Sequence, residues 1–104
     1  MYQVVKTKQL EKWFKKIKNA RNRSIINVRI REIAIKGELC GDRKSLGEGP
    51  FELRFFIGPG YRVYFSLLNG MLLLLLLGGD KTTQALDIRK ARNLLKQLRR
   101  HYET

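Results

Sequence analysis

The sequence is poor in the residues that build metal centres and thiol chemistry. It contains one cysteine, Cys40, and one histidine, His101. One residue of each type cannot form a four-ligand zinc site or an internal disulfide, nor a Cys–His or Ser–His–Asp nucleophile system of the usual kind. We therefore expect no metal and no other cofactor, and a single thiol suits a reducing cytoplasm.

Long apolar segments are also lacking. The longest apolar run, residues 71–77, has seven residues, whereas about 18 are needed to cross a bilayer. Residues 1–5 lack the apolar core of a signal peptide. These observations predict a cytoplasmic protein without a membrane partner.

Acidic residues are scarce relative to basic ones. The chain has 9 Asp and Glu against 22 Lys and Arg, which gives a formal net charge of +13. Such an excess predicts a polyanionic partner, either nucleic acid or an acidic protein. With 104 residues, of which 43% are hydrophobic, the chain should fold as one domain, residues 1–104.

The centre of the chain is typical of a β-hairpin. Two strand-like arms, residues 51–57 and 61–68, flank Gly58-Pro59-Gly60, which suits a turn because proline presets φ and glycine tolerates positive φ. Alternation places apolar residues on one face of both arms. The other face forms a polar platform of Glu52, Arg54, Arg62 and Tyr64. An ordinary half-exposed hairpin with solvated charges is the competing interpretation.

A second hairpin follows directly. Asn69-Gly70 between apolar runs favours a tight type I′ turn, so residues 71–77 should extend the pair to an antiparallel meander. This leucine run is apolar on both faces, which predicts that it is the central strand of the sheet. We expect helices to cover one side of it.

The segments before the hairpins predict a strand and two helices. Residues 2–6 favour a strand, and Thr7 is a candidate N-cap for a helix with the apolar stripe Leu10, Trp13, Phe14 and Ile17. Residues 19–24 indicate a break. Residues 25–35 fit a helix or a strand, and their length favours a helix that ends at Gly37.

The remaining segments are a loop and a closing helix. The four glycines in residues 37–50 predict a long loop. A final helix after Gln84 carries one apolar face, formed by Ile88, Ala91, Leu95 and Leu98. The expected fold is therefore α+β, in the order β-α-α-β-β-β-α.

Arg54, Arg62 and Lys81 form a set of cations at the ends or on one face of neighbouring strands. Such a set can grip a phosphodiester and neutralise the charge that develops in its transition state. The segment Gly78-Gly79-Asp80-Lys81 lacks the full glycine-rich phosphate loop, which makes a nucleotide triphosphatase a weak interpretation.

With these elements in place, the sequence resembles the RelE/ParE superfamily of bacterial toxins. The segments Phe51-Glu-Leu-Arg54, Gly58-Pro-Gly-Tyr-Arg-Val-Tyr-Phe65 and Gly78-Gly-Asp-Lys-Thr-Thr-Gln84-Ala-Leu-Asp-Ile88 are similar to its HigB-like addiction module killer branch. The resemblance covers nearly the whole chain.

The resemblance implies a small microbial-RNase-like fold and the toxin of a type II toxin–antitoxin module. Such a toxin is an endoribonuclease, or mRNA interferase, that enters the ribosomal A site, contacts ribosomal RNA and cuts mRNA there. The 2′-hydroxyl of the RNA attacks the phosphate without a metal, which inhibits translation and arrests growth. A cognate antitoxin is the implied protein partner, for which a helix-turn-helix protein is one candidate.

The resemblance also implies site residues. The reactive positions of RelE-like members match Glu52, Arg54, Arg62 and Lys81. Lys44, Tyr64 and Gln84 are candidate RNA contacts. This sequence departs from RelE at Glu52, where a basic residue is usual, and it lacks the aromatic residue that RelE carries in the final segment.

Two questions stay open at the sequence level. Glu52 can serve as general base for the 2′-hydroxyl, or it can form a salt bridge to Arg54 or Lys44 that only organises the site. The ParE branch shares the fold but poisons DNA gyrase without cutting RNA, and a binding module without catalysis is a third class.

Overall fold

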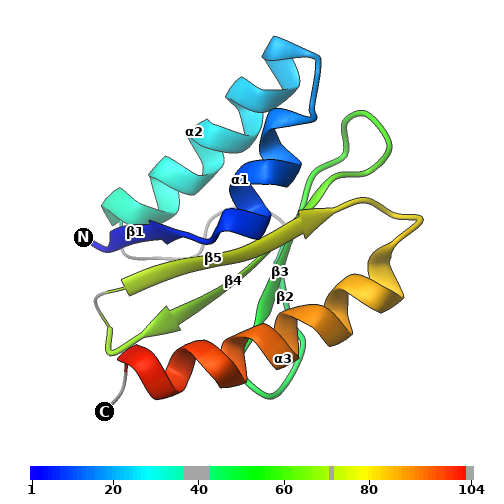
Figure 1. Ribbon diagram of the computed structural model, residues 1–104. Helices are drawn as coiled ribbons and strands as arrows, with labels where there is room; N and C mark the ends of the chain where they lie inside the picture. Colours follow the sequence, from blue (N-terminus) through cyan, green and yellow to red (C-terminus); the bar gives the residue numbers. More distant parts are fainter. Residues whose placement is uncertain (37–42, 71, 103–104) are drawn as a thin grey trace.

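The computed structural model describes residues 1–36, 43–70 and 72–102. Within these residues the chain is an α+β protein with five strands and three helices (Figure 1). The elements in chain order are β1 (Gln3–Lys6), α1 (Lys8–Lys15), α2 (Ala20–Lys36), β2 (Arg43–Ser45), β3 (Phe51–Arg54), β4 (Arg62–Leu68), β5 (Leu72–Gly79) and α3 (Gln84–Tyr102). The predicted order is confirmed, with β2 as an additional strand.

The strands form a single mixed sheet in the order β1-β5-β4-β3-β2. Strands β2 to β5 pair antiparallel, as the meander predicted, whereas β1 pairs parallel with β5. The parallel edge arises because α1 and α2 carry the chain away between β1 and the meander. The central position belongs to β4, so the prediction that the leucine run is the central strand is wrong by one place.

Helices cover both faces of the sheet (Figure 1). Alternate residues of β4 and β5 point to opposite faces of the sheet and belong to two separate hydrophobic cores. Phe65, Leu73 and Leu75 pack with residues of α1 and α2, whereas Leu74 and Leu76 pack with Ala91 and Leu95 of α3. The prediction that helices cover only one side is therefore wrong, because the doubly apolar β5 requires cover on each face.

Helix α1 begins where its sequence signal predicts. The Oγ1 atom of Thr7 accepts a hydrogen bond from the Leu10 amide at 3.1 Å, so Thr7 is the N-cap. The same hydroxyl donates to the Leu76 carbonyl at 2.5 Å, which fixes the start of α1 to β5. The predicted stripe is also confirmed, because Leu10 and Ile17 are buried and Trp13 and Phe14 pack against the same core.

Helix α2 confirms the helical interpretation of residues 25–35. It begins earlier than expected, at Ala20, and the Asn19 side chain accepts a hydrogen bond from the Asn22 amide at 3.1 Å. The predicted break at residues 19–24 is therefore mostly helix, because Asn19 caps it and the exposed or half-buried polar residues that follow tolerate a helical backbone. The predicted stop at Gly37 lies outside the described residues.

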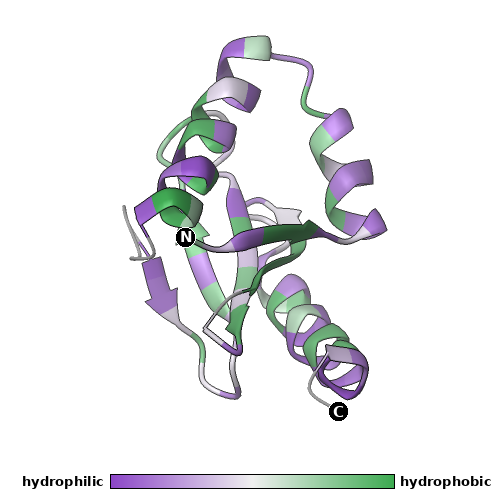
Figure 2. Cartoon of the chain, turned by 90° about the vertical axis from the view of Figure 1, so that its left-hand side faces the viewer, coloured by the Kyte–Doolittle hydropathy of each residue, from purple (hydrophilic) through white to green (hydrophobic). Residues whose placement is uncertain are grey.

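The predicted loop at residues 37–50 contains a strand. Strand β2 pairs with β3, and Lys44 lies opposite Glu52. All three residues of β2 are exposed, and Figure 2 shows this edge of the sheet as hydrophilic. Without an alternating apolar residue, β2 gave no strand signal. Residues 37–42 lie outside the described residues.

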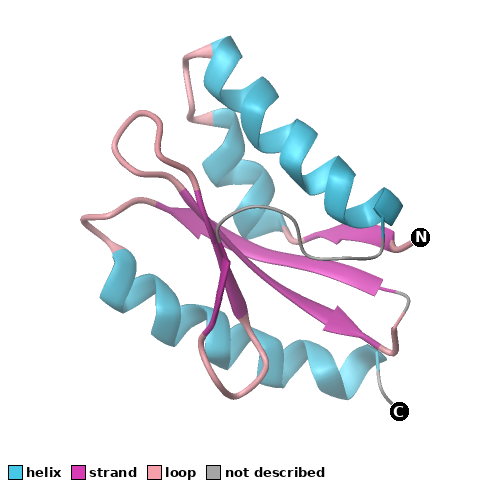
Figure 3. Ribbon diagram, turned by 180° about the vertical axis from the view of Figure 1, so that it is seen from behind, coloured by secondary structure: helices cyan, strands magenta, loops and turns pink. Residues whose placement is uncertain are grey.

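No helix in the described parts of the chain combines the length and the apolar character needed to cross a membrane. Figure 3 shows the sheet from behind; β2 and β3 form one edge of it and β1 forms the other.

Candidate functional site

The candidate site lies where β3, β4 and β5 end near the start of α3. Arg54 of β3 lies opposite Arg62 of β4, and Arg62 in turn lies opposite Gly79 of β5. Side chains at directly opposed positions share one face of a sheet. The two arginines therefore emerge side by side, on the face that α3 covers.

A buried carboxylate holds Arg62. The Oε2 atom of Glu52 lies 3.8 Å from Nε of Arg62, and the side chains are 0% and 12% exposed, respectively. The same oxygen accepts a hydrogen bond from Nε2 of Gln84 at 2.9 Å. Glu52 thus ties β3 and β4 to the first residue of α3 and restricts the guanidinium of Arg62.

The turn between β3 and β4 provides a further contact. The Nη1 atom of Arg62 donates to the Gly60 carbonyl at 2.6 Å. Gly60 has φ +78°, and a Cβ there would lie 3.2 Å from Nη1 of Arg62 and 3.4 Å from Cβ of Lys81. Lys81 is exposed and its amide donates to the Pro59 carbonyl at 3.5 Å. Arg62 and Lys81 therefore flank the same glycine.

A compact turn shapes the approach to α3. The Oδ1 atom of Asp80 accepts from the Thr82 amide at 2.8 Å and from the Thr82 hydroxyl at 2.5 Å. These bonds, with a smaller contribution from the charge of Arg62, hold the pKa of Asp80 below its ordinary value. The bonds that Asp80 accepts from Thr82 close a turn around Lys81, the residue between them.

Two more titratable groups lie buried beneath the arginines. Burial raises the pKa of Tyr64, and the nearby carboxylates of Glu52 and Asp87 raise it further. Asp87 is 6% exposed, and its Oδ2 accepts a hydrogen bond from the Thr83 hydroxyl at 2.5 Å. Burial raises the pKa of Asp87, opposed in part by the Thr83 bond and by Lys90. Arg54 and Arg62 therefore lie above two buried polar side chains, Tyr64 and Asp87.

The structure brings together much of the set that the sequence singled out. Arg54, Arg62 and Lys81 lie at one end of the molecule, and Gln84 is bound to their supporting carboxylate. Lys44 is exposed on the neighbouring strand. The expected open polar platform is wrong for Glu52 and Tyr64, which are both 0% exposed because α3 covers this face.

Sequence reasoning missed two residues of the site, and it missed the exposure of Phe56 in the loop after β3. Asp87 and Thr83 form the buried bond just described, and their i, i+4 spacing at a helix start was the available signal. Phe56, two residues after Arg54, is 84% exposed. Its place in the alternation suggested only the polar face of a strand, whereas β3 ends at Arg54 and leaves Phe56 in the loop.

The arrangement is suited to binding an anion. It has two adjacent arginines and a nearby lysine, and arginine forks onto the oxygens of a phosphate. Among the described residues no group of three or more His, Cys, Asp and Glu side chains could hold a metal ion. The fold and the site together define a small, strongly basic α+β protein with a cationic site at one end of a mixed sheet.

Comparison with known proteins gives the family. The chain is 44% identical over 96 residues to an uncharacterized protein of Haemophilus influenzae, and the match covers 92% of this chain and 95% of that protein. The chain therefore belongs to the same family as this Haemophilus influenzae protein. No family model matches the sequence.

Proposed function

We propose that the protein is the toxin of a type II toxin–antitoxin module, with a RelE-like fold of the HigB-like branch. Its proposed activity is ribosome-dependent cleavage of mRNA by attack of the RNA's own 2′-hydroxyl on the adjacent phosphodiester. The observation that carries the proposal is the tethering of Arg62. Its guanidinium is held by the buried Glu52 carboxylate and by the Gly60 carbonyl, beside Arg54.

The positions of the cations suggest their roles. Arg62 binds the scissile phosphate, because a guanidinium contacts two oxygens at once and keeps its charge at any working pH. Lys81, exposed and close to Gly60, neutralises or protonates the leaving 5′-oxygen. Arg54 stabilises the charge that develops on the phosphate, and Lys44 contacts RNA next to the site. Preorganised cations of this kind act mainly on the transition state.

The buried side chains support these groups from below. Glu52 has no exposed surface, so in this proposal it positions Arg62 rather than accepting the 2′-hydroxyl proton itself. Gln84 holds Glu52 in turn, and Tyr64 packs beside them. None of these three needs to touch RNA to influence the reaction.

The proposed partners follow from this activity and from the charge. The net charge of +13 suits mRNA in the ribosomal A site and the surrounding ribosomal RNA. An antitoxin protein would keep the toxin inactive, and the setting would be the cytoplasm.

The proposal is tested in a purified translation extract. The protein is added with a defined mRNA, and RNA ends are mapped with and without ribosomes. In parallel, gyrase and supercoiled DNA are incubated with the protein and scored for DNA breaks. We expect cuts in mRNA only when ribosomes are present. Gyrase-dependent DNA breaks without RNA cleavage would assign the protein to ParE-like inhibitors. The absence of both RNA cleavage and DNA breaks would indicate a binding module without catalysis.

A further inference from the structure

A groove of about 710 Å³ runs between the start of α1 and the second half of α3, far along α3 from the arginines. Its apolar lining consists of Val5, Leu74, Leu94, Leu98 and Tyr102. Leu74 is buried in the sheet, whereas the side chains from α3 are only partly buried. The groove exists because α3 covers β4 and β5 and leaves the side of β1 partly open.

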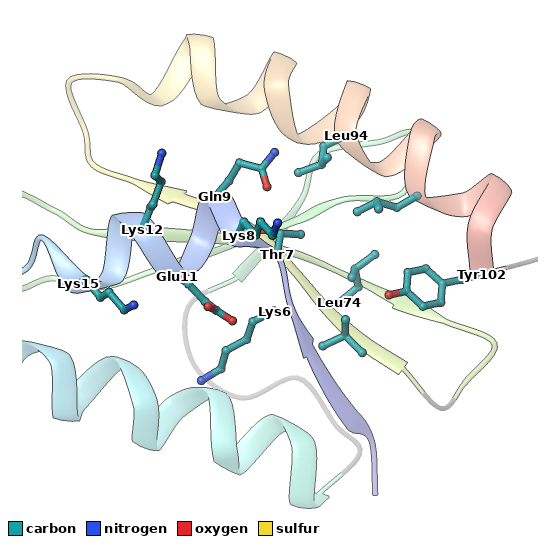
Figure 4. A pocket seen from close by; sticks show the side chains of 12 residues that line it. Lys6, Thr7, Lys8, Gln9, Glu11, Lys12, Lys15, Leu74, Leu94 and Tyr102 are labelled. Atoms are coloured by element: carbon teal, nitrogen blue, oxygen red, sulfur yellow. The ribbon is translucent and has the colours of Figure 1, made fainter.

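The α3 wall has the spacing of a helix-packing ridge. Leu94, Leu98 and Tyr102 stand at i, i+4 and i+8, and such ridges fit into the grooves of another helix. In Figure 4 the ring of Tyr102 extends from the end of α3 toward the middle of the groove. The wall offers about 12 Å of helix axis for contact, at 1.5 Å per residue.

The opposite rim is strongly basic. Lys6, Lys8, Lys12 and Lys15 line the groove with one acid, Glu11. All four lysines are exposed, and the ion pairs within 4 Å recorded in the described parts of the chain lie elsewhere. Figure 4 shows Lys12 and Gln9 pointing from α1 toward α3. The rim therefore offers unused positive charge above an apolar floor.

This combination selects among possible occupants. A floor of leucines does not suit RNA, because RNA phosphates bind cations and RNA bases stack on aromatic side chains. A second copy of the chain would bring a further charge of +13 to a basic rim. A helix with leucines on one face and acidic residues on its flanks fits both parts of the groove. Its leucines pack on the apolar floor and its carboxylates face the lysines of the rim.

We propose that this groove binds an amphipathic, acidic helix of a partner protein. The helix lies between α1 and α3, with its apolar stripe against Leu94, Leu98 and Tyr102 and its carboxylates facing Lys8 and Lys12. The inference rests on the groove itself and stands without nuclease activity. The identification of the occupant with the antitoxin is the one part that rests on the proposed function.

The probe is a synthetic helical peptide of roughly four turns, about 15 residues, with a side-chain bridge that keeps it helical and lowers the ordering cost. It carries leucines at i, i+4, i+7 and i+11 and glutamates on both flanks. The control peptide has the same composition with leucines spread around the helix. Binding is measured by fluorescence anisotropy against the full chain.

Matched protein variants locate the binding. The Lys8→Glu/Lys12→Glu protein reverses charge at the rim, and Lys16→Glu/Lys18→Glu makes the same charge change outside the lining. We expect the rim variant to bind the probe at least about tenfold more weakly, and the control variant to bind nearly as wild type. Leu94→Ala should weaken binding without a charge change. Circular dichroism and thermal melts establish that each variant is folded.

Several results would overturn the proposal. The probe must bind more tightly than its scrambled control, so equal binding or no binding contradicts it. Equal loss in both charge variants would indicate general attraction to a basic surface. If the rim variant instead loses binding of a short RNA or of anionic vesicles but not of the probe, the groove serves that ligand. A wild-type dimer in sedimentation that the rim variant abolishes would assign the groove to a second copy. Each measurement reports on binding directly, so failure here is distinct from failure of RNA cleavage.

Discussion

The Nε atom of Arg62 lies 3.8 Å from Oε2 of Glu52, a carboxylate with no exposed surface. Gln84 donates to the same oxygen at 2.9 Å. A buried carboxylate is costly to desolvate unless it has partners, and Glu52 has two, Arg62 and Gln84. It holds Arg62, which also donates to the Gly60 carbonyl.

Glu52→Gln removes the charge and keeps the shape. If Glu52 positions Arg62, single-turnover mRNA cleavage should fall by up to about 10²-fold, because misplacement of a catalytic group by about 1 Å can cost that much. The pH dependence of the remaining activity should keep its form. A general base would behave differently, since its loss removes the limb of the pH–rate profile that reports its ionisation.

Gln84→Ala tests the second contact of Glu52. The loss leaves a buried carboxylate oxygen with one partner fewer, which should lower the free energy of unfolding by about 1–3 kcal/mol. Urea unfolding monitored by circular dichroism measures the change. Ala85, the next residue, is exposed, so Ala85→Ser provides the control at the same helix end. A Gln84→Ala protein as stable as wild type would show that the hydrogen bond does not contribute.

Gly78 and Gly79 allow the side chains of Trp13 and Asp87 to pack closely against the backbone of β5. A Cβ at Gly78 would lie 2.1 Å from Cε3 of Trp13, and one at Gly79 would lie 1.9 Å from Oδ2 of Asp87. Gly78→Ala should therefore destabilise the protein by about 1–3 kcal/mol through overpacking. Combining it with Trp13→Ala should give less than the sum of the two single effects, because the clash is removed. Strict additivity in urea melts would contradict this packing.

Asp87 gives the stability a specific pH dependence. Its pKa is raised by burial, so the folded protein holds the proton more tightly than the unfolded chain. The contribution of Asp87 to stability is therefore present below its ordinary pKa and lost as pH rises through the raised value. Asp87→Asn cannot titrate and still accepts from Thr83. Its stability relative to wild type should increase between about pH 4 and about pH 7, and a constant difference would contradict the raised pKa.

The sequence predicted the elements better than it predicted the layers. Thr7 and the stripe of α1 were readable because capping and helical spacing are local signals. The position of α3 was not readable, since each apolar face of β5 can be covered by a helix or by a second sheet. The arginine pair followed from strand alternation. The burial of Glu52 and Tyr64 did not, because alternation assigns a face without saying what covers it.

The most direct test of the central claim is single-turnover cleavage of mRNA on programmed ribosomes by wild type, Arg62→Ala and Arg62→Lys. Losing one preorganised contact costs about 10²–10³ in rate, so Arg62→Ala should cleave that much more slowly while remaining folded by circular dichroism. Arg62→Lys should recover little, because the two-pronged contact is lost. Lys81→Ala should show a comparable loss, whereas Lys16→Ala, outside the site, should cleave as wild type. Cleavage by folded Arg62→Ala at the wild-type rate would contradict the account.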